Sequence, residues 1–518
     1  MSGKAVAALA RIEALRLLRH PVILTALLVL GPLVYWATAD PDWRYPVLHD
    51  ADQWTQPPAL VLGSAALLAG NLAVTRAHRG GAAAVFEGLV LRPAERTAAH
   101  LLALLPLAAI TAVLVTGHIV LLASLDGAVS SPNLFELATG PVVVLVCGAI
   151  GVLLGRIVRS AVVAPLLTVV FAAVAVVLLG GPPSSAGPNW FLPIAPASGG
   201  DPLLVPPSVP ADLMTRVPAA HLVYLLGLLA LAASLALLLS HRRPRPGGVI
   251  AVGLAIAITV TGGLAQVQPR TGTIDADRAA ATRQPSAIEH CQVLDRVSYC
   301  AFAGFDPWIK DWAEVTEAIL RRVPPDVAAR PPAIRQRVYA DGYPDQSRLT
   351  RPGDAPLEPP VADWRADDEA AGTPGAITVG TRWGDGWSEA GFAGRLAHDL
   401  INPSGPGVSA ELCGAQGVLI GWLAGQATAG TRAGLRTIAD NSREGIAFLE
   451  FGFPAAITLD QRATDLVWTL LDRPDDEVGR QVLASWGELS APGTTVERAA
   501  QLFGVPAPTA AGDPGRCR

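Results

Sequence analysis

Long runs of apolar residues alternate with short polar segments through the first half of the chain. A transmembrane helix needs about 20 mostly apolar residues, because the hydrocarbon core of a bilayer is about 30 Å thick. The pattern predicts seven spans, at residues 21–38, 58–75, 99–123, 138–155, 161–180, 220–240 and 248–266. Only a very short polar turn separates the fourth span from the fifth. If that pair is wrong, both spans are lost together and the final orientation is unchanged.

The orientation of these spans follows from their Arg and Lys residues. With the N-terminus inside, the inside segments contain 13 Arg and Lys residues, whereas the outside loops contain only Arg44 and Arg216. Cytoplasmic loops carry the excess of these residues in membrane proteins. The first span is not expected to be a cleaved signal peptide, because no small-residue cleavage site follows it and six more spans do. The residues beyond the seventh span are therefore predicted to lie outside the cell membrane of a bacterium.

Composition divides the chain into the same two parts. Mean hydropathy is +0.39, and only 16% of the 518 residues are charged, against about 25% in a typical soluble domain. The net charge is +4 up to residue 269 and −9 from residue 270 onward. We therefore expect an N-terminal interfacial helix at 1–20, a membrane core of six spans at 21–246 and a seventh span at 247–266. A linker at 267–286 and a soluble extracellular domain at 287–518 follow.

The inside loop at residues 76–97 has its own pattern. Residues 82–90 predict a short helix whose apolar side includes Phe86, Leu89 and Val90, and Pro93 ends it, because proline cannot continue the hydrogen-bond ladder of a helix. Glu95 and Thr97 are expected in the first turn of the next helix, where the helix dipole favours a carboxylate. A simple positive-inside loop is the alternative interpretation of these charges.

In its order of features the chain resembles the permease subunits of type-2 ABC exporters. The shared features are an Arg-dotted N-terminal segment, a helix and proline after the second span, a short inside turn after the fourth, and a long outside segment after the fifth. Glu87, Leu89, Pro93 and Arg96 match the family's pattern of a glutamate, apolar residues, a proline and a basic residue. The resemblance covers about residues 1–245. A seventh span and a weakly amphipathic N-terminal helix depart from the family.

The resemblance implies a permease that works with a separate ABC ATPase subunit. Residues 76–97 would then hold the coupling helix, with Phe86, Glu87, Leu89, Pro93 and Arg96 as the ATPase-coupling loop. Both lysines, Lys4 and Lys310, lie outside Gly-rich loops, so the chain has no P-loop of its own. The permease would form a dimer, identical or mixed, within the lipid bilayer. No cofactor, metal or nucleic acid is expected.

Two polar residues interrupt the predicted spans: Asn71 in the second and His118 in the third. Polar residues inside a membrane are functional candidates by default. Asn71 is near the inner end and His118 near the outer end of its span, so the alternative is that both side chains simply reach the interface. Spans this apolar favour a hydrophobic or amphiphilic substrate over a small ion.

The C-terminal domain contains four of the five cysteines, and an oxidising location outside the cell favours disulfides. We expect Cys291–Cys300, because CQVLDRVSYC resembles two short strands around a turn, and Cys413–Cys517, which would tie down the C-terminal tail. Other pairings and a metal site stay open, although the cysteines lack CxxC spacing. Cys147, in the fourth span, is expected to be inert packing.

The domain itself is predicted to be mostly α, an α+β domain. Residues 325–375 are Pro-rich and acidic, and predict a long loop or a partly disordered insert. Helices are predicted at 306–322, 387–401, 409–427, 459–472, 474–487 and 494–503, and strands at 293–302, 376–379 and 446–450. Most of its eight tryptophans are expected in the core, with Trp383 and Trp387 as surface candidates.

The sequence predicts no enzyme in this domain. Neither HExxH nor GxSxG occurs, and no serine stands out as a nucleophile beside His290 or His398. The favoured function is thus the permease subunit of an exporter. A membrane-anchored extracellular sensor or binding protein without transport activity is the alternative, and an envelope hydrolase is the third.

Overall fold

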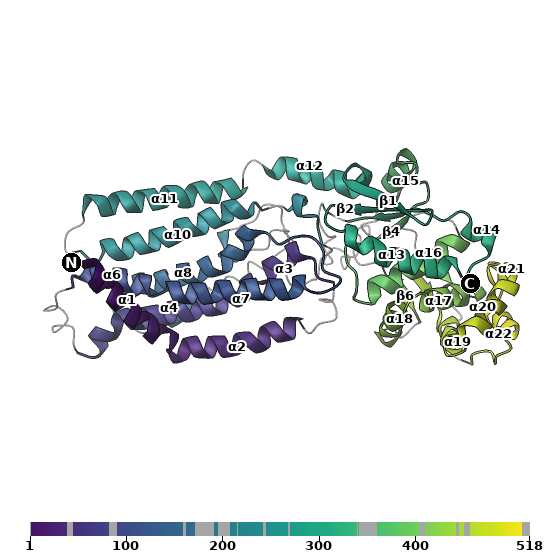
Figure 1. The fold of residues 1–518 in the computed structure, drawn as a ribbon, viewed down its shortest axis with the longest axis horizontal. Coiled ribbons are helices and arrows are strands. Elements are labelled where there is room, and N and C mark those ends of the chain that lie inside the picture. Colours follow the sequence, from purple (N-terminus) through teal and green to yellow (C-terminus); the bar gives the residue numbers. More distant parts are fainter. Residues whose placement is uncertain are drawn as a thin grey trace, which may run out of the picture.

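The computed structural model has two parts, a long helical bundle from the N-terminal half and an α/β domain from the C-terminal half (Figure 1). The two parts lie end to end, so the molecule is elongated. The residues that the structure describes are 2–38, 45–81, 91–158, 162–170, 191–194, 208–214, 216–241, 245–267, 270–338, 340, 360–402, 410–412, 414–441, 445–449 and 456–509.

Among these residues, five helices are long and apolar enough to cross a membrane. They are Leu48–Arg79, Pro93–Ala123, Leu134–Ile157, Pro218–Leu238 and Pro246–Gln266. A sixth results if α1 (Ser2–Leu18) and α2 (Pro21–Thr38), which are bent by 53° at their junction, are counted as one span. The chain is therefore a mostly helical membrane protein with a mixed α/β region.

Six of the seven predicted spans coincide with helices. These are α2, α4 (Gln56–Arg79), α6 and α7 (Pro93–Leu102 and Leu105–Ala123), α8 (Leu134–Ile157), α10 (Pro218–Leu238) and α11 (Pro246–Val267). A short helix α3 (Leu48–Trp54) precedes α4. Residues 163–170 of the predicted fifth span are helical, and residues 171–180 lie outside the described part of the chain.

Close helix contacts in the bundle depend on glycines. A Cβ atom added to Gly151 of α8 would lie 2.1 Å from the carbonyl oxygen of Leu67 on α4. In the same way, Gly227 of α10 faces the backbone of Thr259 on α11. Small residues allow such close approach where lipid provides no hydrophobic driving force. The extra helix α11 packs mainly on α10, and Figure 1 shows it along one edge of the bundle.

The helix α1 crosses obliquely the end of the bundle that lies away from the C-terminal domain, which we call the far end (Figure 1). It packs chiefly against α6 and also contacts α4 and α7. Its buried face includes Ala10, Glu13, Ala14 and Leu17, which recur at helical spacing. The predicted N-terminal helix is thus present, and it is anchored by this face to the bundle.

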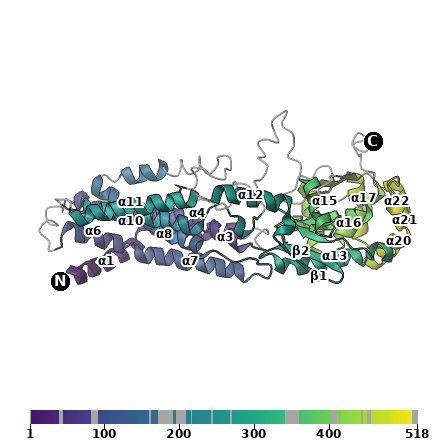
Figure 2. The same cartoon turned by 90° about the horizontal axis from the view of Figure 1, so that it is seen from above.

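The segment predicted as a linker before the C-terminal domain contains a helix. This helix, α12 (Arg270–Arg283), lies between the bundle and the domain in both side views (Figures 1 and 2). Arg278 is 7% exposed and donates from Nη1 to the carbonyl oxygen of Leu213 at 3.1 Å. Its Nε donates to the carbonyl oxygen of Ala340 in the domain. The helix α12 therefore packs against both the bundle and the C-terminal domain.

The first sheet of the domain has the strand order β1-β2-β3-β4. The strands are β1 (Glu289–Leu294), β2 (Val297–Phe302), β3 (Ile334–Gln336) and β4 (Ile377–Val379). The β1–β2 hairpin confirms the predicted turn, because Asp295 and Arg296 both have positive φ, 45° and 76°, as a two-residue turn with right-handed strand twist requires. The strands β2, β3 and β4 are parallel, with α13 (Ile309–Leu320), α14 (Pro325–Ala328) and α15 (Val361–Ala370) in the connections.

The prediction of a long loop at 325–375 is therefore partly wrong. This segment supplies α14, the strand β3 and α15, while residues 339 and 341–359 lie outside the described part. The strand was missed because its sequence, Ile334 to Arg337, is mostly polar, whereas a central parallel strand is usually apolar.

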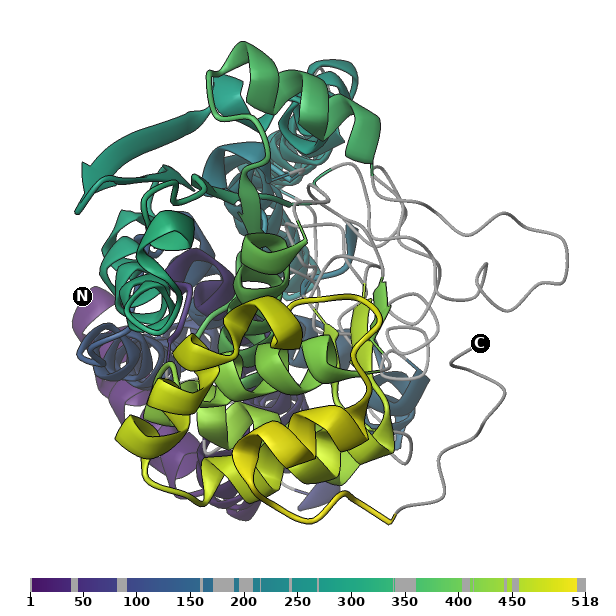
Figure 3. The ribbon, with the colours of Figure 1, turned by 90° about the vertical axis from the view of Figure 1, so that its right-hand side faces the viewer.

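The second sheet has the order β5-β7-β6 and lies among helices. Its strands are β5 (Ala410–Leu412), β6 (Ala447–Leu449) and β7 (Ala456–Leu459). The helices around it are α16 (Trp387–Ile401), α17 (Ala415–Gly425), α18 (Ala429–Asn441), α19 (Gln461–Leu471), α20 (Asp475–Ala484), α21 (Trp486–Leu489) and α22 (Val496–Phe503). Figure 3 shows these helices covering the end of the molecule.

Most predicted helices of the domain are present, with two corrections. Residues 409–427 begin with the strand β5 before α17, and 474–487 is divided between α20 and α21. The N-cap of α22 is Thr495, whose side chain accepts from the backbone N–H of Arg498. Trp383 is only 3% exposed, so it is not a surface residue. Its ring packs edge-on against Phe392 at 5.8 Å.

The bundle and the domain share one hydrophobic core. Val47, Val129 and Val209 of the bundle loops lie in the same buried cluster as Phe305 and Trp308 of the domain. The backbone N–H of Ser130 donates to the carbonyl oxygen of Gly304 at 2.9 Å. Buried polar and apolar contacts thus hold the domain against this end of the bundle, which we call the domain-side end.

Candidate functional site

The described residues on either side of the predicted coupling loop, 76–81 and 91–97, lie at the end of the bundle away from the domain (Figure 1). Phe86, Glu87 and Leu89 fall outside the described residues, whereas Pro93 and Arg96 are at the start of α6. Pro93 occupies the first helical position, where its missing N–H leaves no hydrogen bond unmade. The Glu95 carboxylate accepts from the backbone N–H of Arg92 at 2.9 Å. The predicted helix start after the loop is therefore confirmed.

The start of α6 is linked to another helix of the bundle. Thr97 is fully buried, and its hydroxyl is 2.7 Å from that of Ser240, just after α10. Thr97 also donates to the carbonyl oxygen of Pro93, one turn earlier. A displacement of the helix start would thus be transmitted directly to the end of α10.

A charged cluster connects α1 to α4 beside this helix start. The Glu13 carboxylate, on α1, is 6% exposed. Its Oε1 accepts from Nη1 of Arg16 at 2.8 Å and from Nη1 of Arg76, on α4, at 3.3 Å. Its Oε2 accepts from Nη2 of Arg76 at 3.4 Å. The ion pair between Glu13 and Arg76 thus holds α1 against α4, the helix that precedes residues 82–90.

The two polar residues predicted within the spans differ in their surroundings. Asn71 is 1% exposed on α4, and both atoms of its side-chain amide lack a hydrogen-bond partner. It therefore does not reach the interface, and a buried unpaired amide is costly. His118 is half-buried on α7. The structure does not bring the two together in one hydrogen-bonded group.

A second buried charge network lies at the domain-side end and was missed by sequence reasoning. Arg216, just before α10, donates from Nη2 to Oε1 and Oε2 of Glu136 at 2.9 and 3.0 Å. The Gln56 amide donates to the same carboxylate at 2.5 Å. Asp52 accepts from the backbone of Asn133 at 2.6 Å. These residues lie outside the predicted spans, so their sequence positions gave no sign of burial.

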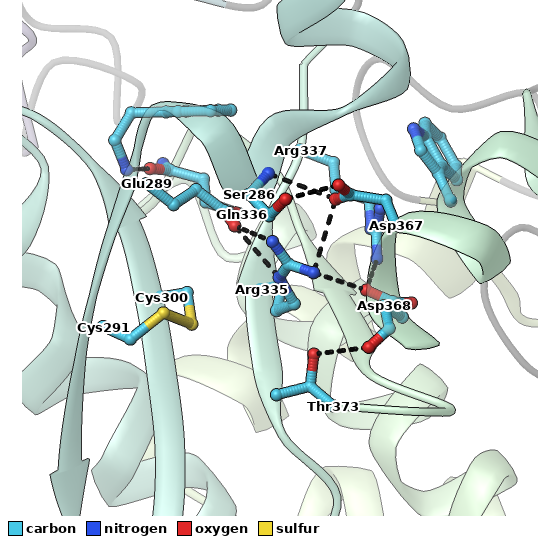
Figure 4. A network of polar contacts seen from close by, with 12 residues as sticks. Ser286, Glu289, Cys291, Cys300, Arg335, Gln336, Arg337, Asp367, Asp368 and Thr373 are labelled. Atoms are coloured by element: carbon cyan, nitrogen blue, oxygen red, sulfur yellow. Dashed lines mark hydrogen bonds and ion pairs between the residues drawn. A yellow bond between two sulfur atoms is a disulfide. The ribbon is translucent and has the colours of Figure 1, made fainter. Parts of the chain in front are cut away.

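The domain contains a third network, drawn in Figure 4, around Arg335 of β3. Its guanidinium donates from Nη2 to Oε2 of Glu289 at 2.5 Å and from Nη1 to Oδ1 of Asp368 at 2.9 Å. Arg337 donates to the same Oδ1 at 2.6 Å and stacks over the ring of Trp364, 5.0 Å from its centroid. All of these charged side chains are at most 1% exposed. The network joins β1, β3 and α15.

Burial shifts the protonation of the acids in this network. Desolvation raises the pKa of Glu289 to about 7, although the nearby charges of Arg335 and Arg337 oppose that shift. Desolvation also raises the pKa of Asp368, against the attraction of Arg337 and Arg335. Removing a carboxylate from water disfavours its charged form, and here this effect is larger than ion pairing.

The disulfide Cys291–Cys300 is confirmed and joins paired positions of β1 and β2 (Figure 4). Cys413 and Cys517 lie outside the described residues. Cys147 is a free, buried cysteine on α8 that packs beside Gly63 of α4, as expected for inert packing. Where the chain is described, no group of three or more His, Cys, Asp and Glu residues is arranged to hold a metal ion.

The histidines of the domain are placed differently. His398 is 3% exposed on α16, and its Nδ1 is 2.8 Å from Oδ1 of the neighbouring Asp399. The hydroxyl of Ser388 donates to Oδ2 of Asp385 at 2.9 Å at the start of the same helix. His290 is exposed on β1. Among the described residues, no hydrogen bond joins a serine to His290 or His398.

A search among known protein families, curated proteins and solved structures found no match to this chain. The function has to be argued from the chain itself.

Proposed function

We propose that this chain is the permease subunit of an ATP-driven exporter of the cell membrane, powered by a separate ATPase. One observation carries the proposal. The N-terminal helix α1 lies across the far end of the bundle and packs on α6, the helix that begins directly after the loop at 82–90. Glu13 of α1 is also paired with Arg76 of α4, the helix that leads into that loop.

This arrangement favours coupling over simple anchoring. A force applied to residues 82–90 would reach α4 and α6 along the chain, α1 through the Arg76–Glu13 pair and α10 through the Thr97–Ser240 hydrogen bond. Packed helices move as rigid elements, so such a force is converted into a movement of the whole bundle. The long apolar helices would provide the pathway, with a second permease copy completing it, and a hydrophobic or amphiphilic substrate suits them best.

Retention of an ATPase by the purified chain tests the proposal. The tagged full-length protein, isolated from its own cells in mild detergent, is expected to retain a P-loop ATPase. Glu87→Arg should reduce that retention strongly, because it reverses the charge in the loop. Arg11→Glu, a charge reversal on the exposed face of α1, is the matched control and should leave retention unchanged. An unaltered chain that retains no ATPase under these conditions would refute the proposal.

A second function, a membrane-anchored sensor or binding protein, is favoured by the core that the bundle shares with the domain. A ligand that shifts the domain would shift Val47, Val129 and the helices attached to them. A sensor needs no ATPase, so an ATPase whose retention responds to Glu87→Arg decides for the permease.

A further inference from the structure

Two buried carboxylates lie at the domain-side end of the bundle, and only one of them has a cationic partner. Glu136, in the first turn of α8, accepts from Arg216 and from Gln56, as described above. Asp52, on α3, is 0% exposed, and the negative charge of Glu136 acts on it. Its Oδ2 accepts from the backbone N–H of Asn133, whereas its Oδ1 is buried without a hydrogen-bond partner. Both oxygens of Glu136 are thus satisfied, and one oxygen of Asp52 is not.

The charges around Asp52 do not compensate a second negative charge. Of the charged groups that act on Asp52, Glu136 and Asp50 are negative and Arg216 is positive. Arg216 is already paired with Glu136, at 2.9 Å. The guanidinium of Arg382, in the domain, acts on Asp50. An ionised Asp52 would therefore leave an uncompensated charge in a place closed to water, which is costly.

The other elements packed on α3 bring no cation to Asp52. The helix α7 packs on α3 through apolar residues, and its only titratable residue is the half-buried His118. The helix α4 has its charged residues in its last turn, at the far end of the bundle. His49, one turn before Asp52 on α3, has both ring nitrogens in hydrogen bonds, with the hydroxyl of Ser130 and the carbonyl oxygen of Val209. Among the described residues, no ion pair therefore neutralises Asp52.

A proton on Oδ1 of Asp52 would remove the unpaired charge. A buried carboxylate without a cation takes up a proton in preference to staying charged, and two neighbouring carboxylates rarely both ionise. The other oxygen, Oδ2, would keep its hydrogen bond from Asn133. A metal cation fits less well, because the oxygens of Glu136 already accept from Arg216 and Gln56.

We propose that Asp52 is a proton-binding site, and that the bound proton holds α3 against the start of α8. Loss of the proton would place two negative charges side by side and push Asp52 away from Glu136 and Asn133. The movement would reach the domain, because His49 of α3 is hydrogen-bonded to Ser130, whose backbone N–H donates to Gly304. The inference does not depend on the proposed transport function, because it concerns only a proton and the attachment of the domain.

Neutral substitutions at the two carboxylates should have different effects on the full-length chain in detergent. Asp52→Asn keeps an oxygen that can accept from Asn133 and carries no charge, so the unfolding temperature at neutral pH should stay the same or rise. Glu136→Gln leaves Arg216 buried without its carboxylate, which should lower the unfolding temperature by about 5 °C or more. A larger loss in Asp52→Asn than in Glu136→Gln would mean that Asp52 is the ionised partner, and would overturn the proposal.

Infrared difference spectroscopy locates the proton directly. In a detergent without ester groups at neutral pH, the spectrum of the unaltered chain minus that of Asp52→Asn should show the C=O stretch of a protonated carboxyl group. Glu289 is present in both proteins, so its own band cancels. A difference spectrum with carboxylate bands alone would contradict a bound proton. Stabilisation by sodium ions that Asp52→Asn abolishes would assign a metal cation to the site and overturn the proposal as well.

The effect on the domain is tested by a comparison at several pH values. The folded chain holds a proton that the unfolded chain releases above about pH 4, so rising pH should destabilise the unaltered chain relative to Asp52→Asn. Limited proteolysis within α12 should likewise increase with pH in the unaltered chain more than in Asp52→Asn, with both proteins digested side by side. Cleavage that is the same in both proteins at every pH would refute the link between the proton and the domain.

Discussion

The indole of Trp308 donates from Nε1 to the carbonyl oxygen of Gly127 at 2.8 Å. The first residue belongs to the C-terminal domain, and the second to the connection between α7 and α8 of the bundle. Trp308 is 1% exposed, so the hydrogen bond is shielded from water. A single side chain thus connects two parts of the chain that lie 181 residues apart in sequence.

Replacing this indole tests how firmly the domain is held. Trp308→Phe keeps an aromatic ring but leaves the Gly127 carbonyl buried without its donor, which should lower the free energy of unfolding by about 1–3 kcal/mol. Thermal unfolding and limited proteolysis within α12 provide the measurements. Trp486→Phe, at a half-buried position on α21, is the control. Equal stability of the two variants would contradict a structural role for the hydrogen bond.

The pKa of Glu289 predicts a dependence of domain stability on pH. Its pKa rises from 4.5 to about 7 on folding, so the folded chain binds more protons than the unfolded chain between these values. The contribution of Glu289 to stability is therefore greatest below about pH 4.5, and decreases as the pH rises to about 7. Glu289→Gln should abolish this part of the slope in a series of chemical unfolding curves. The same slope in both proteins would assign it to other groups.

The disulfide Cys291–Cys300 should stabilise the β1–β2 hairpin. It closes a short loop with a sequence separation of 9, and chain entropy predicts about 2–3 kcal/mol for a loop of that size. The double variant Cys291→Ala/Cys300→Ala should therefore unfold at a lower denaturant concentration than the oxidised chain. In a Cys413→Ala/Cys517→Ala background, which removes the second expected pair, reducing agent should shift the chain that keeps Cys291 and Cys300 to the midpoint of the chain that lacks them, and leave the latter unmoved. Cys147→Ala, in the bundle, should keep the full response to reductant.

The close contact between α4 and α8 at Gly151 predicts that alanine lowers stability there, whereas alanine at a glycine without such a contact does not. Gly151→Ala would place a methyl group 2.1 Å from the Leu67 carbonyl oxygen, so the helices have to separate at a cost of about 1–3 kcal/mol. Gly253→Ala on α11 meets nothing within 4 Å and should be neutral or slightly stabilising, because alanine favours helix. Thermal stability in detergent compares them. Equal stability of the two variants would show that the close approach is not needed.

The bundle was largely predictable from sequence because its signal is local. Each span is a long apolar run, which identifies a helix without any knowledge of its neighbours. The hairpin was predictable for a similar reason, since Asp295 and Arg296 lie between two cysteines at matching positions. By contrast, β3 was not predictable from residues 334–337 alone. Arg335 and Arg337 can be buried only because Glu289 and Asp368, distant in sequence, accept their hydrogen bonds.

The candidate site shows the same limit. Arg16 and Arg76 were identifiable as orientation signals, because the number of such residues in a loop matters and not their position. Their common pairing with Glu13 depends on how α1 packs on α4. Trp383 was misassigned because TRWGDGWSE resembles an exposed turn, while its ring in fact lies against Trp312, with the centroids 6.4 Å apart.

The shared core has a consequence for the way in which this chain is made. Val47 and Val129 leave the ribosome long before Phe305 and Trp308, which cover them in the finished protein. During synthesis these valines stay uncovered while the later membrane helices are inserted. Synthesis of residues 305–308 thus covers these valines, and a chain interrupted before them would expose an apolar patch at the surface of the membrane.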